Sequence, residues 1–267
     1  MRLAVTFLAA ATIAISVAPA QMQDNRDKKM TCENGGSGDR ARYCEIREQS
    51  FAGSGRLSVD AGRNGGATVK GWLQNDVLVR ARVEAWGDTN SEASSLAGQV
   101  HVETAGAQVT ATGPESPNQS GWSVSYEIFV PQNTNLNLKT HNGGIAISDV
   151  RGQIEFSATN GGVHLNRLAG EVSGTTVNGG LQIVLAGNNW EGRQLEVSTR
   201  NGGVNLSMPE SYSAHIRTET VNGGIQSDFP VTVHGNLRPR NLEFDLGSGG
   251  PLIHVSTRNG GVRLHRL

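Results

Sequence analysis

The tripeptide Asn-Gly-Gly recurs along this chain of 267 residues, and its spacing restricts the possible folds more than any other feature. The six copies in the second half follow one another at intervals of 18, 18, 23, 21 and 37 residues. Their asparagines are Asn142, Asn160, Asn178, Asn201, Asn222 and Asn259. A period near twenty residues is typical of stacked supersecondary units. The interval of 37 residues predicts one repeat that has lost its Asn-Gly-Gly.

Apolar and polar residues alternate on both sides of each tripeptide. Around Asn201, Leu195 and Val197 precede the tripeptide, and Val204 and Leu206 follow it. A period of two predicts two short strands per repeat, each with one face toward a core. Antiparallel hairpins would place successive turns at alternate ends of a sheet, yet the residues around the turn do not alternate between repeats. The pattern therefore predicts an all-β solenoid, with rungs of about 18–23 residues and parallel strands about 4.8 Å apart.

We expect the six repeated asparagines to be structural corner turns and not ligand-binding residues. Asn and Gly tolerate the left-handed or otherwise unusual backbone conformations that a tight corner needs. The side-chain amides of stacked asparagines can also form a hydrogen-bonded ladder from rung to rung.

The first twenty residues have the pattern of a secretory signal sequence. Arg2 precedes an apolar run from Leu3 to Val17, and the small-residue pattern Ala-Pro-Ala ends at Ala20. The run is too short to span a bilayer, and no later segment resembles a membrane span. The sequence therefore predicts an exported protein (periplasmic, cell-surface or secreted) with no integral membrane segment.

The chain has two cysteines, Cys32 and Cys44, and an oxidising compartment favours a disulfide between them. A metal site is the other interpretation, but two thiols with Glu45 do not make a tetrahedral set. Taken together, these patterns predict four segments. Residues 1–20 are the signal peptide, 21–44 a disulfide-tied leader, 45–135 an N-terminal β region that begins and caps the solenoid, and 136–267 the solenoid repeats. Within the cap region, SEASSLAGQV predicts a short helix.

Four stretches of the chain resemble a known family. These are CEIRE from Cys44, VSYEIFVPQNTNLNLKTHNGG, HIRTETVNGGIQSDFPV and LGSGGPLIHVSTRNGGVRL. They resemble the bacterial putative-adhesin family of exported β-strand-repeat domains of unknown function, over roughly Cys44 to Leu267. The resemblance implies a single-stranded, right-handed parallel β-helix. Many relatives carry Gly-Asp where this chain has Gly-Gly, so a row of carboxylates that could bind cations is missing.

An enzyme that cleaves polysaccharides is the main alternative to a binding protein, because carboxylates on one face of a β-helix can supply acid and base. The outward column five places before each asparagine reads Asn137, Glu155, Ser173, Glu196, Arg217 and His254. Glu155 and Glu196 stand two rungs apart, about 9.5 Å at strand spacing, within the range for inverting glycosidases. With Arg217 expected beside Glu196, a solvated ion pair explains the column equally well.

No other pattern indicates catalysis, a metal or a cofactor. The seven histidines show no paired metal spacing, and Trp190 is the one large aromatic platform among the repeats. The formal net charge of −1 and the absence of long charged runs give no indication of a nucleic-acid partner. We therefore expect a non-catalytic structural or adhesin-like binding module without cofactor, whose partner is a cell-surface polymer or a protein.

The final repeat, RNGGVRLHRL, is expected to form an open end of the solenoid. An exposed strand there offers unpaired backbone groups to another chain. Arg263, His265 and Arg266 are expected to guard this edge and keep the protein monomeric. The alternative is head-to-tail self-association through the same end.

Overall fold

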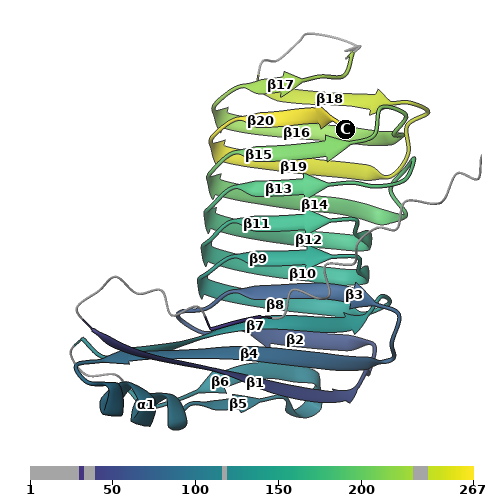
Figure 1. The fold of residues 1–267 in the computed structure, drawn as a ribbon. Coiled ribbons are helices and arrows are strands. Elements are labelled where there is room, and N and C mark those ends of the chain that lie inside the picture. Colours follow the sequence, from purple (N-terminus) through teal and green to yellow (C-terminus); the bar gives the residue numbers. More distant parts are fainter. Residues whose placement is uncertain (1–29, 33–39, 116–118, 231–239) are drawn as a thin grey trace, which may run out of the picture.

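The computed structural model describes residues 30–32, 40–115, 119–230 and 240–267, which build an elongated stack of strands (Figure 1). Its repeating unit is a rung made of one strand before an Asn-Gly-Gly corner and one strand after it. In spatial order the rungs are β2 (Arg56–Asp60) with β3 (Ala67–Trp72), β8 (Asn135–Asn142) with β9 (Ile145–Ser148), β10 (Arg151–Asn160) with β11 (Val163–Asn166), β12 (Ala169–Asn178) with β13 (Leu181–Val184), β14 (Gly192–Asn201) with β15 (Val204–Met208), β19 (Leu252–Asn259) with β20 (Val262–Arg266), and β16 (Ala214–Asn222) with β17 (Ile225–Ser227).

The rungs stack into two sheets, which we name the β8 sheet and the β9 sheet. The β8 sheet holds the strands before the corners, and β18 (Asn241–Leu246), β6 (Gln108–Thr112) and β5 (His101–Glu103) complete its two ends. The β9 sheet holds the strands after the corners, and β7 (Gly121–Pro131), β4 (Asp76–Gly87) and β1 (Ala41–Ala52) continue it at one end. Neighbouring rungs pair in parallel, with Asn160 opposite both Asn142 and Asn178. The predicted β-solenoid is thereby confirmed.

Rungs follow the order of the sequence except at one end of the stack. Strand β19 lies between β14 and β16, and β20 lies between β15 and β17. The chain therefore forms the outermost rung with β16 and β17 first. It then forms β18 antiparallel to β16. Finally, β19 and β20 form the rung between the outermost rung and the rung of β14 and β15 (Figure 1).

The prediction of a lost repeat within the 37-residue interval is wrong, because β18 is an added antiparallel strand and not a degenerate rung. The turn that follows β18 contains Gly247 and Gly249 with φ of 59° and 75°, which side chains rarely adopt.

The prediction of an open end guarded by basic residues is also wrong, since β20 is paired on both sides. Arg263 donates to Gln226 Oε1, and the His265 ring lies 3.2 Å from an Asp228 carboxylate oxygen. Arg266 pairs with Glu210 at 2.8 Å. These side chains connect neighbouring rungs on the outside of the β9 sheet.

The corner glycines allow the backbones of neighbouring rungs to approach closely. The sequence instead predicts glycine there from the backbone conformation of the corner. Among the corner glycines only Gly260 has a positive φ. A Cβ atom on Gly161 would lie 2.1 Å from the Gly143 carbonyl oxygen, and one on Gly179 would lie 2.0 Å from the Gly161 carbonyl oxygen. The same overlap recurs at the first glycine of the other corners, so any side chain there would push two rungs apart.

The corner asparagines form an uninterrupted ladder across the seven rungs. In each rung after the first, the Nδ2 group of the asparagine donates to Oδ1 of the asparagine in the neighbouring rung nearer β2, at 2.7–3.0 Å. The order is Asn64, Asn142, Asn160, Asn178, Asn201, Asn259 and Asn222. Asn64 thus sits directly under Asn142, although 78 residues separate them. Each of these seven corner asparagines therefore hydrogen-bonds the asparagine of a neighbouring rung.

Buried threonines fix the corners from the inside. Thr176 Oγ1 donates to the Gly161 carbonyl at 2.9 Å, and Thr199 Oγ1 donates to the Gly179 carbonyl at 2.7 Å. Deeper in the rungs the core is mostly aliphatic. Phe156 is an aromatic residue of this core, and Gly174 beside it leaves the space that its ring fills, because a Cβ there would lie 2.5 Å from the ring.

An antiparallel unit covers the first rung. Strands β1, β4 and β7 form it, and β7 pairs in parallel with β3 of the first rung. Helix α1 (Asn90–Gly98) packs Leu96 and Ala97 onto this unit (Figure 1). Thr89 Oγ1 accepts from the backbone N–H of Glu92 at 3.1 Å and caps the helix. Among the described residues, no helix has both the length and the apolar character needed to cross a membrane. The expected signal sequence lies outside these residues.

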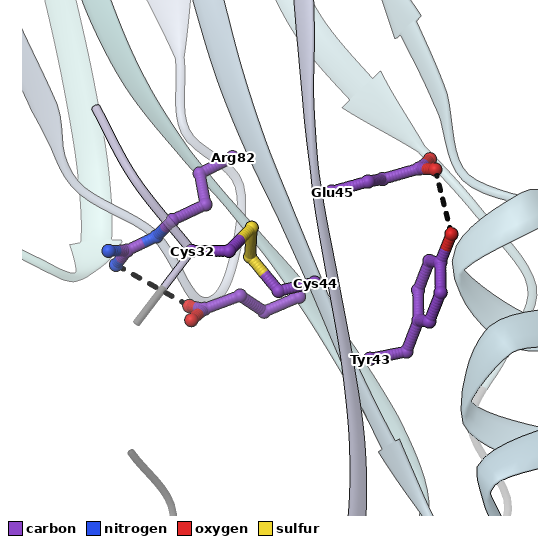
Figure 2. The surroundings of a disulfide bond; sticks show 6 residues. Cys32, Tyr43, Cys44, Glu45 and Arg82 are labelled. Atoms are coloured by element: carbon purple, nitrogen blue, oxygen red, sulfur yellow. Dashed lines mark hydrogen bonds and ion pairs between the residues drawn. A yellow bond between two sulfur atoms is a disulfide. The ribbon is translucent and has the colours of Figure 1, made fainter. Parts of the chain in front are cut away.

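Cys32 and Cys44 form a disulfide (Figure 2), with their Cα atoms 5.8 Å apart. Cys44 lies in β1, opposite Glu84 of β4, so residues 30–32 are tied to the edge strand of the β9 sheet. Arg82 and Glu84 form an ion pair at 3.5 Å on the neighbouring strand. A disulfide such as Cys32–Cys44 is typical of proteins outside the reducing cytoplasm.

Thiol titration tests the disulfide directly. We expect the unfolded, unreduced protein to show no free thiol, and the same protein after reduction to show both. By loop-entropy reasoning, reduction lowers the free energy of unfolding by at most about 3 kcal/mol, because the closed loop is short. Free thiols before reduction would contradict the pairing.

Alanine substitution tests the role of the corner glycines. Gly161→Ala drives a Cβ into the Gly143 carbonyl, so we expect the free energy of unfolding in urea to fall by about 3 kcal/mol or more. Gly162→Ala is the matched control. Its Cβ would meet nothing nearer than 3.6 Å, so a change of less than about 1 kcal/mol is expected. Equal losses in both variants would exclude close approach as the reason for glycine.

Candidate binding face

The outer face of the β8 sheet carries columns of polar side chains. Parallel pairing in register places equivalent positions of successive rungs side by side, about 4.8 Å apart. The column five places before the corner asparagine runs, in spatial order, Asn137, Glu155, Ser173, Glu196, His254 and Arg217. The rigid spacing of these columns comes from the corners and the aliphatic core behind them.

The structure changes the expected neighbours in this column. His254, and not Arg217, lies next to Glu196, because the inserted strand β19 separates β14 from β16. The His254 Nδ1 atom is 3.4 Å from Glu196 Oε1, and its Nε2 atom is 3.9 Å from Glu219 Oε1. Arg217 instead donates to Glu219 at 2.8 Å.

Glu155 and Glu196 share the column but not a groove. Glu155 lines a hollow of about 480 Å³ over β2, β8 and β10. Glu196 is not among the residues of that hollow and contacts His254. A pair of catalytic carboxylates must flank one bound sugar linkage. Glu155 therefore lines this hollow without Glu196, which lies beside His254 two rungs away.

The hollow beside Glu155, which we name the amide groove, is lined by uncharged and charged polar side chains. They are Arg56, Ser58, Gln108, Asn135, Asn137, Gln153 and Glu155. Asn135 Oδ1 accepts from the backbone N–H of Gln153 at 2.8 Å, which fixes one amide of the groove. Planar amides offer donors and acceptors together, so this groove can hydrogen-bond neutral hydroxyl-rich ligands.

A second hollow, which we name the arginine groove, crosses β12, β14, β19 and β16 near their corners. Its volume is about 730 Å³. The polar residues along it are Thr175, Ser198, Arg200, Glu219, Arg240, Asn241, Ser256 and Arg258. Sequence reasoning missed this groove, because it depends on strands β14 and β19 being neighbours.

Trp190 does not offer the platform that the sequence suggested. It is 2% exposed, and its Nε1 group donates to the Gly170 carbonyl at 3.0 Å, so the indole belongs to the core. Trp86 and Trp122 are half-buried and line a separate hollow of about 530 Å³ at the base of the stack. Within the described part of the chain, no group of three or more His, Cys, Asp or Glu side chains could hold a metal ion.

His215 joins the outermost rung to strand β18. Its Nδ1 atom lies 2.7 Å from Asp245 Oδ1, and its Nε2 atom lies 3.1 Å from Glu243 Oε1. The hydrogen bond to Asp245 is the main cause that raises the pKa of His215 above its ordinary value. Burial, the next largest effect, lowers this pKa, and the hydrogen bond to Glu243 raises it again. The protonated ring therefore holds β18 against β16.

This contact predicts pH-dependent stability. Because the folded-state pKa is raised, the contribution is full below the ordinary value of 6.5 and is lost as the pH rises through the folded-state pKa. We expect the melting temperature of the wild type to exceed that of His215→Asn at about pH 6, and the difference to shrink by about pH 8.5. His141→Asn, at an exposed histidine on β8, is the control and should show no such convergence.

The family to which this solenoid belongs follows from comparison with known sequences. The profile of the family described as Toastrack DUF4097 matches residues 87–265, two thirds of the chain. The chain belongs to the Toastrack DUF4097 family. The match begins at the end of β4 and extends through the inserted rung. A comparison with curated proteins gives no match.

The solved structures similar to this Toastrack protein include bacterial proteins described as putative adhesins. A putative cell adhesion protein from Clostridium sporogenes is 12% identical, with a TM-score of 0.45, over 84% of this chain and 100% of that chain. A putative adhesin from Bacteroides fragilis is 11% identical, with a TM-score of 0.30, over 82% and 97%. One from Parabacteroides merdae is 9% identical, with a TM-score of 0.31, over 83% and 95%.

Proposed function

We propose that this Toastrack protein is an exported, non-catalytic binding module that holds an extended polymer of the cell surface on the outer face of its β8 sheet. The observation that carries the proposal is the position of the two grooves. The amide groove covers β2, β8 and β10, and the arginine groove covers β12, β14, β19 and β16. These seven strands are consecutive in the sheet, so both grooves belong to one continuous face.

The rigidity of the face supports a binding role. Side chains on stacked, in-register strands have fixed spacing, so less conformational entropy is lost when they bind a ligand. The Asn ladder and the corner glycines resist changes in rung spacing. A polymer laid across the rungs would meet a new set of polar side chains at each rung, at the fixed spacing of the strands.

The alternative, a polysaccharide-cleaving enzyme, has the two-rung spacing of Glu155 and Glu196 in its favour, but these two carboxylates do not line the same groove. Glu196 contacts His254, whereas Glu155 lines the amide groove. A glycosidase needs a general acid and a general base on opposite sides of one linkage. Glu155 and Glu196 do not line one groove in which they could take these two roles. Binding without cleavage is therefore the function that the geometry supports.

A binding screen tests this function. The protein without residues 1–20 is applied to a glycan array and to intact bacterial cells, and we expect saturable binding to at least one surface polymer. Each bound polymer is then incubated with the protein and assayed for new reducing ends, and none are expected. Absence of binding to the array and to cells would contradict the proposal, and new reducing ends abolished in Glu155→Gln would favour the enzyme.

A further inference from the structure

Two identical heptapeptides lie side by side in the arginine groove. Ser-Thr-Arg-Asn-Gly-Gly-Val occurs at residues 198–204 and again at 256–262. Strands β14 and β19 pair Thr199 with Thr257 and Asn201 with Asn259. Arg200 and Arg258 are therefore direct neighbours on adjacent strands, and both are exposed.

This arrangement leaves positive charge without compensation. Like charges opposite one another on neighbouring strands are unfavourable. In the parts of the chain that the structure describes, neither Arg200 nor Arg258 forms an ion pair, and Arg240 lines the same groove. The carboxylate of Glu219, which also lines the groove, accepts a hydrogen bond from Arg217.

The lining of the groove also indicates the kind of ligand. Hydroxyl groups of Thr175, Ser198 and Ser256 lie among the arginines and can hydrogen-bond a hydroxylated ligand. The described residues that line the groove include no aromatic side chain, whereas single-stranded nucleic acids are usually bound by base stacking on aromatic rings. The groove crosses four adjacent strands, so it has the length to contact several units of a chain.

We propose that the arginine groove binds the acidic groups of an anionic polysaccharide. Arg200, Arg258 and Arg240 would donate charge-assisted hydrogen bonds to carboxylate or sulfate groups, to which the planar guanidinium can bind through two parallel bonds. The serine and threonine hydroxyls would contact sugar hydroxyls between them. This inference rests on the proposed binding function and names the substrate class of its positively charged half.

The test compares two double variants with the same change in charge. Arg200→Gln/Arg258→Gln removes the paired arginines of the groove. Arg42→Gln/Arg193→Gln removes two exposed arginines outside the groove and is the matched control. Because Arg200 and Arg258 repel each other, the groove variant should melt no lower than the wild type, and this measurement shows that it is folded. The single variants Arg200→Gln and Arg258→Gln should have intermediate affinities.

The probes are polygalacturonate, dextran sulfate, neutral dextran and polyphosphate, measured by calorimetry at two salt concentrations. We expect the wild type to bind at least one of the two acidic polysaccharides, more weakly at high salt because ions screen the arginines. Neutral dextran should not bind. The groove variant should lose affinity by about tenfold or more, and the control variant should keep it.

Several results would overturn the inference. They are unchanged affinity in the groove variant, an equal loss in the control variant, equal binding of neutral dextran, and binding of polyphosphate alone. The proposed function has a separate outcome. Binding to cells or neutral glycans without binding to either acidic polysaccharide would refute the groove assignment and leave the binding module intact, whereas no binding to any surface would refute both.

Discussion

The close contact between successive Asn-Gly-Gly corners is the interaction on which the rest of the structure depends. The Gly161 carbonyl accepts a hydrogen bond from Thr176 and lies where a Cβ on Gly179 would be. One oxygen thus sets both the distance and the register between two rungs. The asparagine ladder continues this contact on the outside, and the aliphatic core fills the space that it fixes on the inside. The polar columns of the β8 sheet are evenly spaced because the corners are.

Much of this could be predicted from the sequence, because local spacing encodes it. The period of the corners, the inward positions of Leu195 and Val197, and the disulfide partners Cys32 and Cys44 all follow from residue patterns. The reason for the glycines could not be predicted in the same way. Positive φ is a property of one residue, whereas close approach of two backbones depends on which rung lies beneath, and the sequence does not show that contact.

The arginine groove could not be predicted from the sequence either, because it also depends on which strands are neighbours in the stack. Arg200 and Arg258 stand 58 residues apart in the chain and become neighbours only because β19 enters between β14 and β16. The repeated heptapeptide was a visible signal, but its two copies would be neighbours in no stack that followed the order of the sequence. In the same way, Asn64 joins the ladder because the chain leaves the first rung, forms β4, α1, β5, β6 and β7, and returns at β8.

The inserted rung has a consequence for the time course of folding. A solenoid built in sequence order can grow during synthesis, each new rung docking on the one before. Here that sequence of events stops at β15, because the strands that follow, β16 and β17, have their partners in β19 and β20. While residues 252–266 are still being made, the outermost rung has no final place to dock, and the open face of β14 and β15 remains exposed. Residues 252–266 therefore complete the stack through non-local contacts with β14 and β15, and contacts of this kind generally slow folding.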